Sequence, residues 1–271
     1  MKSKLISALC LQLLLVPAVI AEERELPLWE AGIAVGAATL PQYMGSDERY
    51  NFAAPIPFFI YRGERLKIDR GSITTELFGV RNLSLDASLG IGLPVRNSNR
   101  ARAGMPDLKF SLQAGPRLNW RIHEDEAFRV TARMPWRGVI DTSGSWRGWV
   151  SEPDMVFAYR PDADLRLQLN AGLLYGSRRF HDTYYTVAPA YATPQRPVYQ
   201  SRAGLHSWSL TATARYRLSD SISLFSAVRY RNLASGVIAD SPLVKDQNYL
   251  SATIGMAWSI WESDQLVTRD D

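Results

Sequence analysis

Three histidines are the first candidates for catalytic groups, because histidine is the side chain that ordinarily transfers protons near neutral pH. They are His123, His181 and His206. His206 directly precedes Ser207, but neighbouring residues of a strand point to opposite faces. The parity of Trp208 and Leu210 places His206 toward lipid or the interface. The pattern brings no serine, histidine and acid together. We therefore predict no catalytic residues and a protein that is not an enzyme.

Metal and cofactor sites lack their usual spacing. Glu124-Asp125-Glu126 is a run of charge typical of a solvated turn, and Asp240 with Asp246 lacks the ligand spacing of a calcium loop. Gly90-Ile91-Gly92 lacks the third glycine of a nucleotide-binding loop. We expect no metal and no cofactor.

Arginine is the most suggestive charged residue. Ten arginines share the parity that would face the inside of a barrel: Arg117, Arg121, Arg129, Arg133, Arg137, Arg166, Arg215, Arg217, Arg229 and Arg231. They could line an anion-attracting path. They could also pair with inward acids and fill the lumen, which suits the planar guanidinium. We favour the pairing.

The N-terminus predicts export. Lys2 and Lys4 precede a mostly apolar stretch from Leu5 to Val16, and Val19-Ile20-Ala21 resembles a cleavage site. The apolar stretch is too short to span a bilayer as a helix. We predict a signal peptide over residues 1–21 that contains the single cysteine, Cys10.

The charge balance does not indicate nucleic acid as a partner. The chain of 271 residues has a formal net charge of +4, and Lys2 and Lys4 supply two of these charges. The remaining basic residues are mostly arginines spread along the chain rather than clustered.

Apolar and polar residues alternate over long segments of the mature chain, and no segment after residue 21 shows a sustained helical period. The clearest alternating segments are 83–95, 108–122, 128–136, 165–175, 208–218 and 250–260. A period of two predicts strands. Strands in soluble sandwiches usually have about five or six residues, whereas these are long enough to cross a bilayer at a tilt.

The connections between the strands alternate between short and long. The short ones are Arg62-Gly63, Arg81-Asn82, His123 to Glu126, Pro161 to Asp164 and Ser219 to Ser221; the long ones are Leu40 to Tyr50, Arg96 to Asp107, Asp141 to Gly148, Ser177 to Leu205 and Ala234 to Gln247. Short periplasmic turns and longer extracellular loops are typical of outer-membrane barrels.

The strand count depends on one segment, Glu64 to Val80. Bacterial single-chain barrels have an even number of strands, so we split it at Arg70-Gly71-Ser72. The predicted fold is all-β: a single antiparallel up-and-down transmembrane β-barrel of about twelve strands, with ten as the alternative. The barrel would cover residues 22–261, and residues 262–271 would form a polar periplasmic tail.

Aromatic residues gather near the predicted strand ends, as in the girdles at membrane interfaces. They include Trp29, Tyr61, Trp120, Trp136, Tyr159, Tyr175, Trp208, Tyr230, Trp258 and Trp261. A soluble β-sandwich is the alternative, and the length of the strands argues against it.

Four motifs in order make the chain similar to the MipA/OmpV family of outer-membrane proteins. They are LPQYMGSD (40–47), RAGMPDL (102–108), YY (184–185) with PAYAT (189–193), and ADSPLV (239–244). Their loop residues that we single out are Gly45, Ser46, Asp47, Gly104, Met105, Pro106, Asp107, Tyr191, Asp240, Ser241 and Pro242. The resemblance covers essentially the whole mature chain.

The resemblance implies a barrel in the cell outer membrane, in contact with lipid and lipopolysaccharide. It also implies a scaffold role in murein synthesis, with a lytic transglycosylase and a bifunctional penicillin-binding protein as partners. Other members of the family are regarded as porin-like proteins or adhesins, so the alternative is an anion-biased channel for small solutes. A hydrolase embedded in the barrel is a more distant alternative.

The last strand resembles the assembly signal of outer-membrane barrels at Gly255, Trp258 and Ile260. Such chains usually end at the final aromatic residue, whereas ten residues follow Trp261 here.

Overall fold

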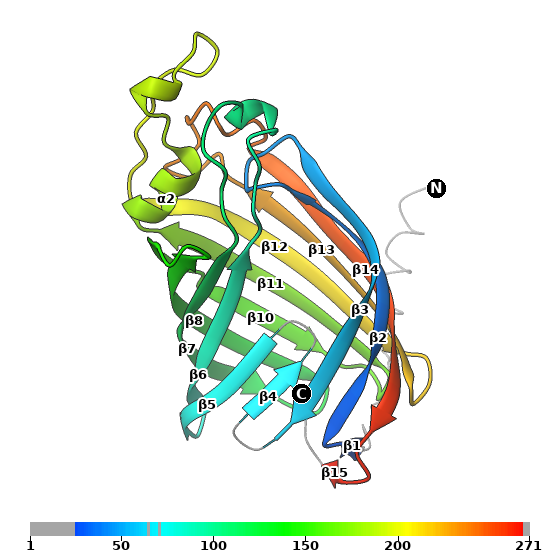
Figure 1. Ribbon diagram of the computed structural model, residues 1–271. Coiled ribbons are helices and arrows are strands. Elements are labelled where there is room, and N and C mark those ends of the chain that lie inside the picture. Colours follow the sequence, from blue (N-terminus) through cyan, green and yellow to red (C-terminus); the bar gives the residue numbers. More distant parts are fainter. Residues whose placement is uncertain (1–24, 64–65, 70–71, 268–271) are drawn as a thin grey trace, which may run out of the picture.

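The computed structural model describes residues 25–63, 66–69 and 72–267 (Figure 1). The predicted signal peptide, Arg70 and Gly71 of the predicted split, and residues 268–271 of the predicted tail lie outside the described residues.

Thirteen strands form one antiparallel sheet that closes on itself (Figure 1). They are β2 (Trp29–Pro41), β3 (Arg49–Arg62), β4 (Leu66–Asp69), β5 (Ser72–Val80), β6 (Leu83–Gly92), β7 (Ser111–Glu124), β8 (Phe128–Asp141), β9 (Trp146–Ser151), β10 (Asp154–Tyr159), β11 (Leu165–Gly176), β12 (Gly204–Arg217), β13 (Ile222–Asn232) and β14 (Asn248–Glu262). Strands that are neighbours in sequence pair with each other, except β9 and β10, and β14 pairs with β2 to close the barrel. The prediction of a β-barrel is confirmed.

Two short strands share one position in this wall. Both β9 and β10 lie between β8 and β11, and the strand is interrupted between them at Glu152 and Pro153. Proline has no N–H to donate to the ladder, so a strand ends readily there. The thirteen strands therefore occupy twelve positions. Because β4 and β5 pair antiparallel, Glu64 to Val80 is not one strand, and the predicted split is confirmed.

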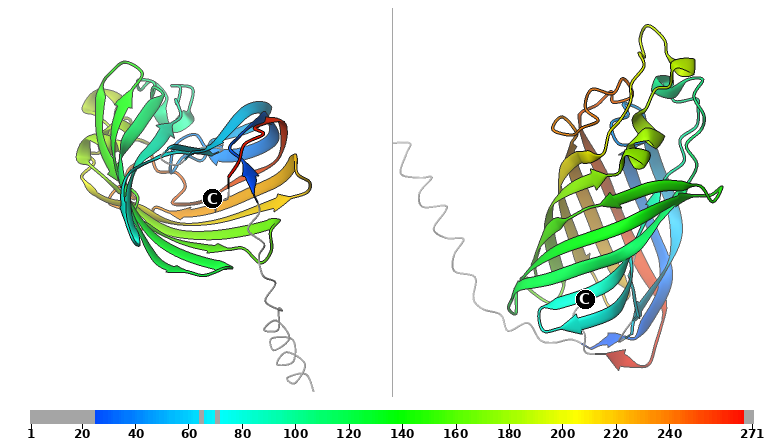
Figure 2. Two further views of the ribbon diagram at one scale, coloured as in Figure 1. Left: turned by 90° about the horizontal axis from the view of Figure 1, so that it is seen from below. Right: turned by 90° about the vertical axis from the view of Figure 1, so that its left-hand side faces the viewer.

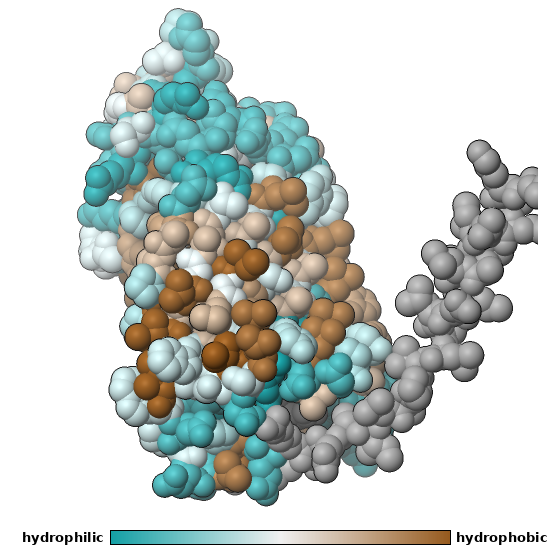
Figure 3. Space-filling model, turned by 90° about the vertical axis from the view of Figure 1, so that its right-hand side faces the viewer, coloured by the Kyte–Doolittle hydropathy of each residue, from teal (hydrophilic) through white to brown (hydrophobic). Residues whose placement is uncertain are grey.

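The outer wall carries a belt of large apolar side chains between two polar ends (Figure 3). Leu112, Met134 and Ile254 are 59%, 57% and 66% exposed, each at the parity that the alternation assigned to the outside. The view from below in Figure 2 shows the strands as one curved wall. Such a belt matches the apolar band that outer-membrane barrels present to lipid.

The pairing of β3 changes along its length. All of β3 pairs with β2, but only Tyr61 and Arg62 pair with β4. Arg62 donates its backbone N–H to Leu28 on the β2 side. Because the backbone groups of successive strand residues point to alternate sides, the backbone nitrogens of residues 55 and 57 point away from β2. Both positions are prolines, which fit a sheet edge because they need no hydrogen-bond acceptor there. Within the described residues, β3 from Arg49 to Ile60 is thus an edge on the side of β4.

The long loops pack together over one end of the barrel and form what we call the loop layer, residues 42–48, 93–110, 177–203 and 233–247 (Figures 1 and 2). Val187, Leu233, Ile238 and Leu243 have no exposed surface. This end is extracellular if the short turns are periplasmic. The loops therefore form a packed layer with a core of its own rather than separate excursions of the chain.

The four motif segments contact one another inside the loop layer. The Tyr43 hydroxyl donates to the Leu243 carbonyl at 2.6 Å, and the Ser241 hydroxyl donates to the Tyr185 carbonyl at 2.7 Å. Asn99, next to the second motif, donates to the Ser46 hydroxyl at 3.1 Å. Segments far apart in sequence are thereby held as one unit.

A short helix, α2 (Arg178–Tyr185), lies in the longest loop, and the periodicity of the sequence did not predict it. The helix has only eight residues, too few for a sustained period. Ser177 caps its start by accepting the Phe180 N–H at 3.3 Å. The face with Phe180 and Tyr185 is buried in the loop layer.

No helix among residues 25–63, 66–69 and 72–267 is long and apolar enough to cross a membrane.

The two ends of the described chain meet at the end of the barrel with the short turns (Figure 2). There β1 (Leu26–Pro27) pairs with β15 (Leu266–Val267). Ser263 also donates its backbone N–H to Trp29 at 3.0 Å. The residues after Trp261 thus include the last residue of β14 and a small paired element.

Leu112 and Gln113 test which face of β7 meets lipid. Leu112→Arg should lower the free energy of unfolding by about 2–4 kcal/mol, because a lipid-facing charge near the bilayer midplane costs that much. Gln113→Arg adds the same group to the lumen face and should cost much less. Urea unfolding in lipid vesicles, followed by tryptophan fluorescence, measures both. Equal losses would contradict the register of β7.

The hydroxyl of Tyr43 tests the loop layer. Tyr43→Phe leaves the buried Leu243 carbonyl without its donor, which costs about 1–3 kcal/mol. Trypsin should then cut faster after Lys245, in the same loop. Tyr50→Phe removes an exposed hydrogen bond to the Pro94 carbonyl and serves as the control. Unchanged cleavage at Lys245 in Tyr43→Phe would show that this contact does not hold the loop.

Candidate functional site

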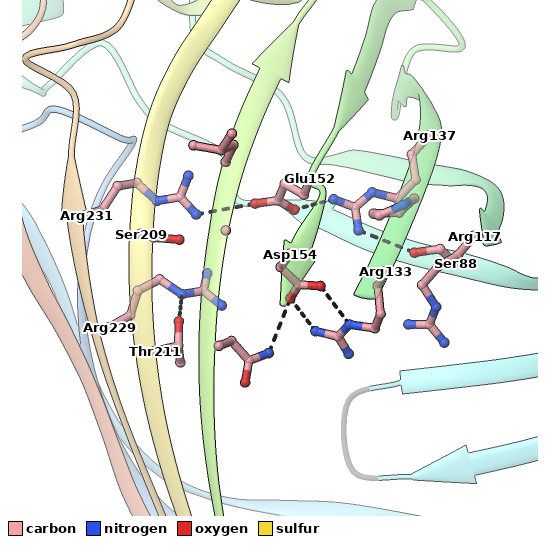
Figure 4. Close-up of a pocket in the computed structure, with 14 residues that line it drawn as sticks. Ser88, Arg117, Arg133, Arg137, Glu152, Asp154, Ser209, Thr211, Arg229 and Arg231 are labelled. Carbon is pink, nitrogen blue, oxygen red and sulfur yellow. Dashed lines mark hydrogen bonds and ion pairs between the residues drawn. The ribbon is translucent and has the colours of Figure 1, made fainter. Parts of the chain in front are cut away.

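Half of the ten predicted lumen arginines surround one polar pocket in the barrel wall (Figure 4). They are Arg117, Arg133, Arg137, Arg229 and Arg231, from strands β7, β8 and β13. Glu152 and Asp154 are the acidic residues of the lining, and the cavity measures about 150 Å³. The pocket is therefore much larger than the roughly 10–15 Å³ that one water molecule needs.

The other five arginines lie apart from this pocket. Arg121 and Arg129 both pair with Glu124 at 2.5 Å, at the short turn between β7 and β8. Arg166 and Arg215 are direct partners in the register of β11 and β12, and Arg217 follows near the end of β12. The alternation of the sequence placed all ten arginines on the inner face of the barrel. It did not distinguish the five that line the pocket from the five that lie elsewhere.

A single row of paired residues crosses five strands beneath the pocket. In register it runs Arg133, Asp154, Gly172, Ser209 and Arg231, from β8 to β13. The row has charged ends and small residues in the middle. Neighbouring strands lie about 4.8 Å apart, so the small residues leave a hollow roughly two strands wide.

Two of the five arginines have a carboxylate of their own. Arg117 holds Asp86 through two hydrogen bonds of 2.9 and 2.8 Å. Arg133 holds Asp154 through two hydrogen bonds of 2.8 and 2.5 Å. Paired hydrogen bonds of this kind are the strongest geometry for arginine and a carboxylate. The positive charges of these two arginines are therefore neutralised by ion pairs inside the lumen.

The other three arginines share one carboxylate, Glu152. Arg137 pairs with one of its oxygens and Arg231 lies 3.3 Å from the other (Figure 4). Arg229 donates to the Thr211 hydroxyl at 2.9 Å. Among the described residues, no carboxylate oxygen lies within 4.0 Å of its guanidinium group. This part of the wall therefore holds an excess of positive charge. The signal for Glu152 in the sequence was an acid beside a proline within a strand, and sequence reasoning missed it.

His206 faces neither lipid nor the interface, so that prediction is wrong. The register of β11 and β12 pairs Leu174 with Ser207 and Tyr175 with Leu205, which leaves His206 as the extra residue of a β-bulge. A bulge shifts the parity of a strand by one. His206 and Ser207 are both fully buried on the inside instead.

A directed chain of hydrogen bonds runs through the bulge. Arg231 donates to Ser207 at 2.8 Å, and Ser207 lies 2.9 Å from His206 Nδ1. The Tyr185 hydroxyl lies 2.7 Å from His206 Nε2 and gives its one proton to the Met44 carbonyl at 2.8 Å. His206 is then the donor to Tyr185, which assigns the proton to Nε2. The chain connects the barrel wall to α2 and to the β2–β3 loop.

Among the described residues, this chain of hydrogen bonds does not include the serine, histidine and acid of a catalytic triad. His206 bonds to Ser207 and Tyr185 and to no carboxylate, and neither His206 nor Ser207 has exposed surface. A substrate could not reach either residue in this arrangement.

The other two histidines also have structural surroundings. Burial lowers the pKa of His181 in α2, and its Nδ1 lies 2.6 Å from the Arg202 carbonyl. His123, at the opposite end of the barrel, contacts Asp125 at 2.9 Å, and this hydrogen bond is the main reason that the pKa of Asp125 is lowered. Across residues 25–63, 66–69 and 72–267, no group of three or more histidine, cysteine, aspartate or glutamate residues is placed to hold a metal ion.

The predicted motif residues lie in the loop layer. Gly45 adopts a φ of +94° and its carbonyl accepts N–H groups from Lys245 and Asp246 at 2.7 and 3.1 Å. Gly104 adopts a φ of +78°, and Met105 is buried beside Leu243. The carbonyl of Pro106 accepts from Arg102, and Asp107 accepts the Asn97 N–H.

The remaining motif residues are distributed between exposed and packed positions. Asp47 pairs with Arg100 at 3.3 Å on the surface. The Tyr191 carbonyl accepts from Arg196, Asp240 is exposed, and Pro242 is half-buried next to Ser241.

Of the predicted assembly signal, Trp258 and Ile260 are 52% and 37% exposed on the outer wall. Gly255 lies under the ring of Phe225, where an added Cβ would come within 2.4 Å of the ring.

Solved structures with a similar fold include an outer membrane channel from Pseudomonas putida F1, with 10% identity over 90% of this chain and 99% of that chain and a TM-score of 0.47. Outer membrane phospholipase A from Escherichia coli shares 11% identity over 90% and 93% of the two chains, with a TM-score of 0.37. Likenesses at these levels bear on neither substrate nor mechanism.

None of the curated proteins matches this chain. A family model does match, and it covers residues 33–260, which include almost all of the barrel and all four motifs. The chain belongs to the family described as MltA-interacting protein MipA, and it is an outer-membrane β-barrel protein.

Proposed function

We propose that this chain is a non-enzymatic interaction protein of the outer membrane that presents its periplasmic face to enzymes of murein synthesis. The observation that carries the proposal is the family match, whose description names an interaction with MltA. The expected partners are a lytic transglycosylase and a bifunctional penicillin-binding protein. Lipid and lipopolysaccharide would surround the outer wall.

The two ends of the barrel support a periplasmic partner. The loop layer covers the lumen residues at one end, where Tyr185, His206 and Ser207 are buried. The other end carries short turns and both described ends of the chain (Figure 1). A periplasmic enzyme would meet a rim of short turns there, each of which joins two strands of the sheet.

This rim is rich in exposed acids, which we call the acidic rim: Glu126, Asp162, Asp164, Asp220, Glu262 and Asp264. They come from three separate turns and from the end of β14. Charge of one sign on an exposed surface speeds association with a surface of the opposite sign. We infer a partner with a basic patch.

A channel for small anions is the second candidate, and the excess of arginine in the lumen pocket is the observation that favours it. The loop layer is the observation against it, because packed residues from four loops cover the extracellular end. Transport would require that layer to rearrange.

The acidic rim makes the interaction testable. The double variant Glu126→Gln with Asp164→Asn should weaken binding of a soluble lytic transglycosylase of the MltA type by roughly fivefold at low salt, mainly through a slower association rate. The difference should shrink near 1 M salt, where the Debye length is about 3 Å. Surface plasmon resonance with the full barrel in detergent measures both rates.

Asp240→Asn with Asp246→Asn is the matched control, since it removes two exposed acids from the loop layer instead. Its affinity should equal that of the native protein. Absence of transglycosylase binding by the native barrel would remove the proposed function, whereas equal weakening by both double variants would remove only the acidic rim.

Conductance separates the two candidates. The interaction role predicts no steady current through a planar bilayer that holds the native barrel, because the loop layer covers one end. A steady anion-selective current from properly folded protein would favour the channel instead. Heat-modifiable mobility on a gel verifies that the inserted protein is folded.

A further inference from the structure

The charge balance of the lumen pocket is uneven at one place. We call this place the arginine hollow: Arg137, Arg229 and Arg231, with Gly172 and Ser209 as its floor. Arg117 and Arg133 are neutralised by Asp86 and Asp154, but the three arginines of the hollow share only Glu152. Within the described structure, the three positive charges of the hollow thus face the single negative charge of Glu152, which leaves a net excess of two positive charges.

We propose that the arginine hollow binds a ligand through a phosphate group. A phosphate monoester carries a charge of about −1.5 to −2 near pH 7, which matches the two uncompensated guanidinium groups. Arginine binds phosphate through two parallel N–H···O bonds, and the site offers three arginines on neighbouring parts of the wall. A single carboxylate would leave one of the two charges uncompensated.

Donors are available in the hollow. Arg229 is exposed to the lumen, and its Nε donates a hydrogen bond to the Thr211 hydroxyl. Arg137 is buried, and its Nε has no hydrogen-bond partner among the described residues. A buried donor without a partner costs free energy, so the hydrogen-bonding capacity of the Arg137 guanidinium is not fully used in this arrangement.

The space for the ligand follows from the small residues of the floor. A Cβ at Gly172 would lie 2.9 Å from the Asp154 Cβ and 3.3 Å from the Pro153 carbonyl, so only glycine keeps this part of the row clear. The Ser209 and Thr211 side chains add hydroxyl groups to the lining (Figure 4). The cavity of about 150 Å³ is open on the lumen side, where Arg229 is exposed.

The hollow is also held in position before any ligand arrives. Arg231 is fixed by Ser207 and Glu152, and Arg137 by Glu152 and the Ser88 hydroxyl. Arginines fixed on strands lose little freedom on binding, which favours affinity. Glu152 keeps the guanidinium groups together and competes with an incoming anion for them.

This inference does not rest on the interaction role, since it concerns the lumen and not the acidic rim. A phosphate group could come from a lipid headgroup or from a small soluble compound, and matched probes distinguish the two sources. Phosphatidic acid is compared with diacylglycerol of the same chains in maltoside micelles. Glycerol 3-phosphate is compared with glycerol.

Isothermal titration of the full barrel at low salt should show saturable binding, one ligand per chain, for at least one phosphate probe and for neither phosphate-free control. Binding of phosphatidic acid alone assigns a lipid, and binding of glycerol 3-phosphate assigns a soluble compound. Absence of saturable binding for both phosphate probes, or equal binding of probe and control, would overturn the proposal.

Variants locate the binding in the hollow. Arg229→Gln should weaken it by roughly tenfold or more, which is the value of one hydrogen bond to a charged group. Arg217→Gln makes the same change of charge near the end of β12, away from the hollow, and should change affinity less than about twofold at moderate ionic strength.

Glu152→Gln gives a change of opposite sign. It releases Arg137 and Arg231 from their carboxylate, so the phosphate probe should bind several-fold more tightly, which damage to the fold would not produce. Heat-modifiable mobility reports folding for each variant. Equal affinity of Arg229→Gln and the native barrel, or weaker binding by Glu152→Gln in a folded protein, would contradict the assignment.

Discussion

Closure of the sheet by β14 and β2 is the constraint on which the rest of the structure depends. In lipid an open sheet edge in the apolar region is costly. The pairing of β14 with β2 removes such an edge at this seam, whereas β3 keeps one from Arg49 to Ile60 on the side of β4, where Pro55 and Pro57 have no N–H to satisfy. The pairing runs from Ala252 with Thr39 to Glu262 with Glu30. Glycines allow the close contact, because a Cβ at Gly36 would lie 2.8 Å from the Ile254 carbonyl. Closure fixes which side chains face lipid and which face one another across the lumen.

The closed wall explains why charge is concentrated inside. Arginine and acid side chains that would be costly in lipid pair across neighbouring strands, as Arg117 does with Asp86 and Arg133 with Asp154. The break at Pro153 places Glu152 between Arg137 and Arg231, so that one carboxylate serves both. The lumen is thus held by ion pairs over much of the pocket and remains electropositive at the arginine hollow.

The sequence predicted the parts of the fold that repeat. Alternation placed Leu112 and Ile254 outside, and the even strand count placed a split at Arg70-Gly71-Ser72, which the β4–β5 pairing confirms. It failed where local geometry departs from the period. The bulge at His206 adds one residue, and α2 is only two turns long, so neither leaves a periodic signal.

The candidate site was only half visible in the sequence, for a related reason. Parity gives the side of the wall on which an arginine lies, but it does not give the register of strands far apart in sequence. Arg133 and Arg231 belong to one row only because four successive strand pairings align them. Nothing in the sequence distinguishes Gly172 from other strand glycines. Only the register of the strands shows that it lies between Asp154 and Ser209.

The two ends of the barrel also determine how the arginine hollow can be reached. The hydrogen bonds from Arg231 through Ser207 and His206 to Tyr185 link the hollow to the loop layer above it. Because these residues are buried, a ligand cannot enter past them while the loop layer is packed. A phosphate-bearing ligand would therefore approach from within the barrel. The same contacts that hold the loop layer would couple an occupied hollow to the loops, since both depend on the position of Arg231.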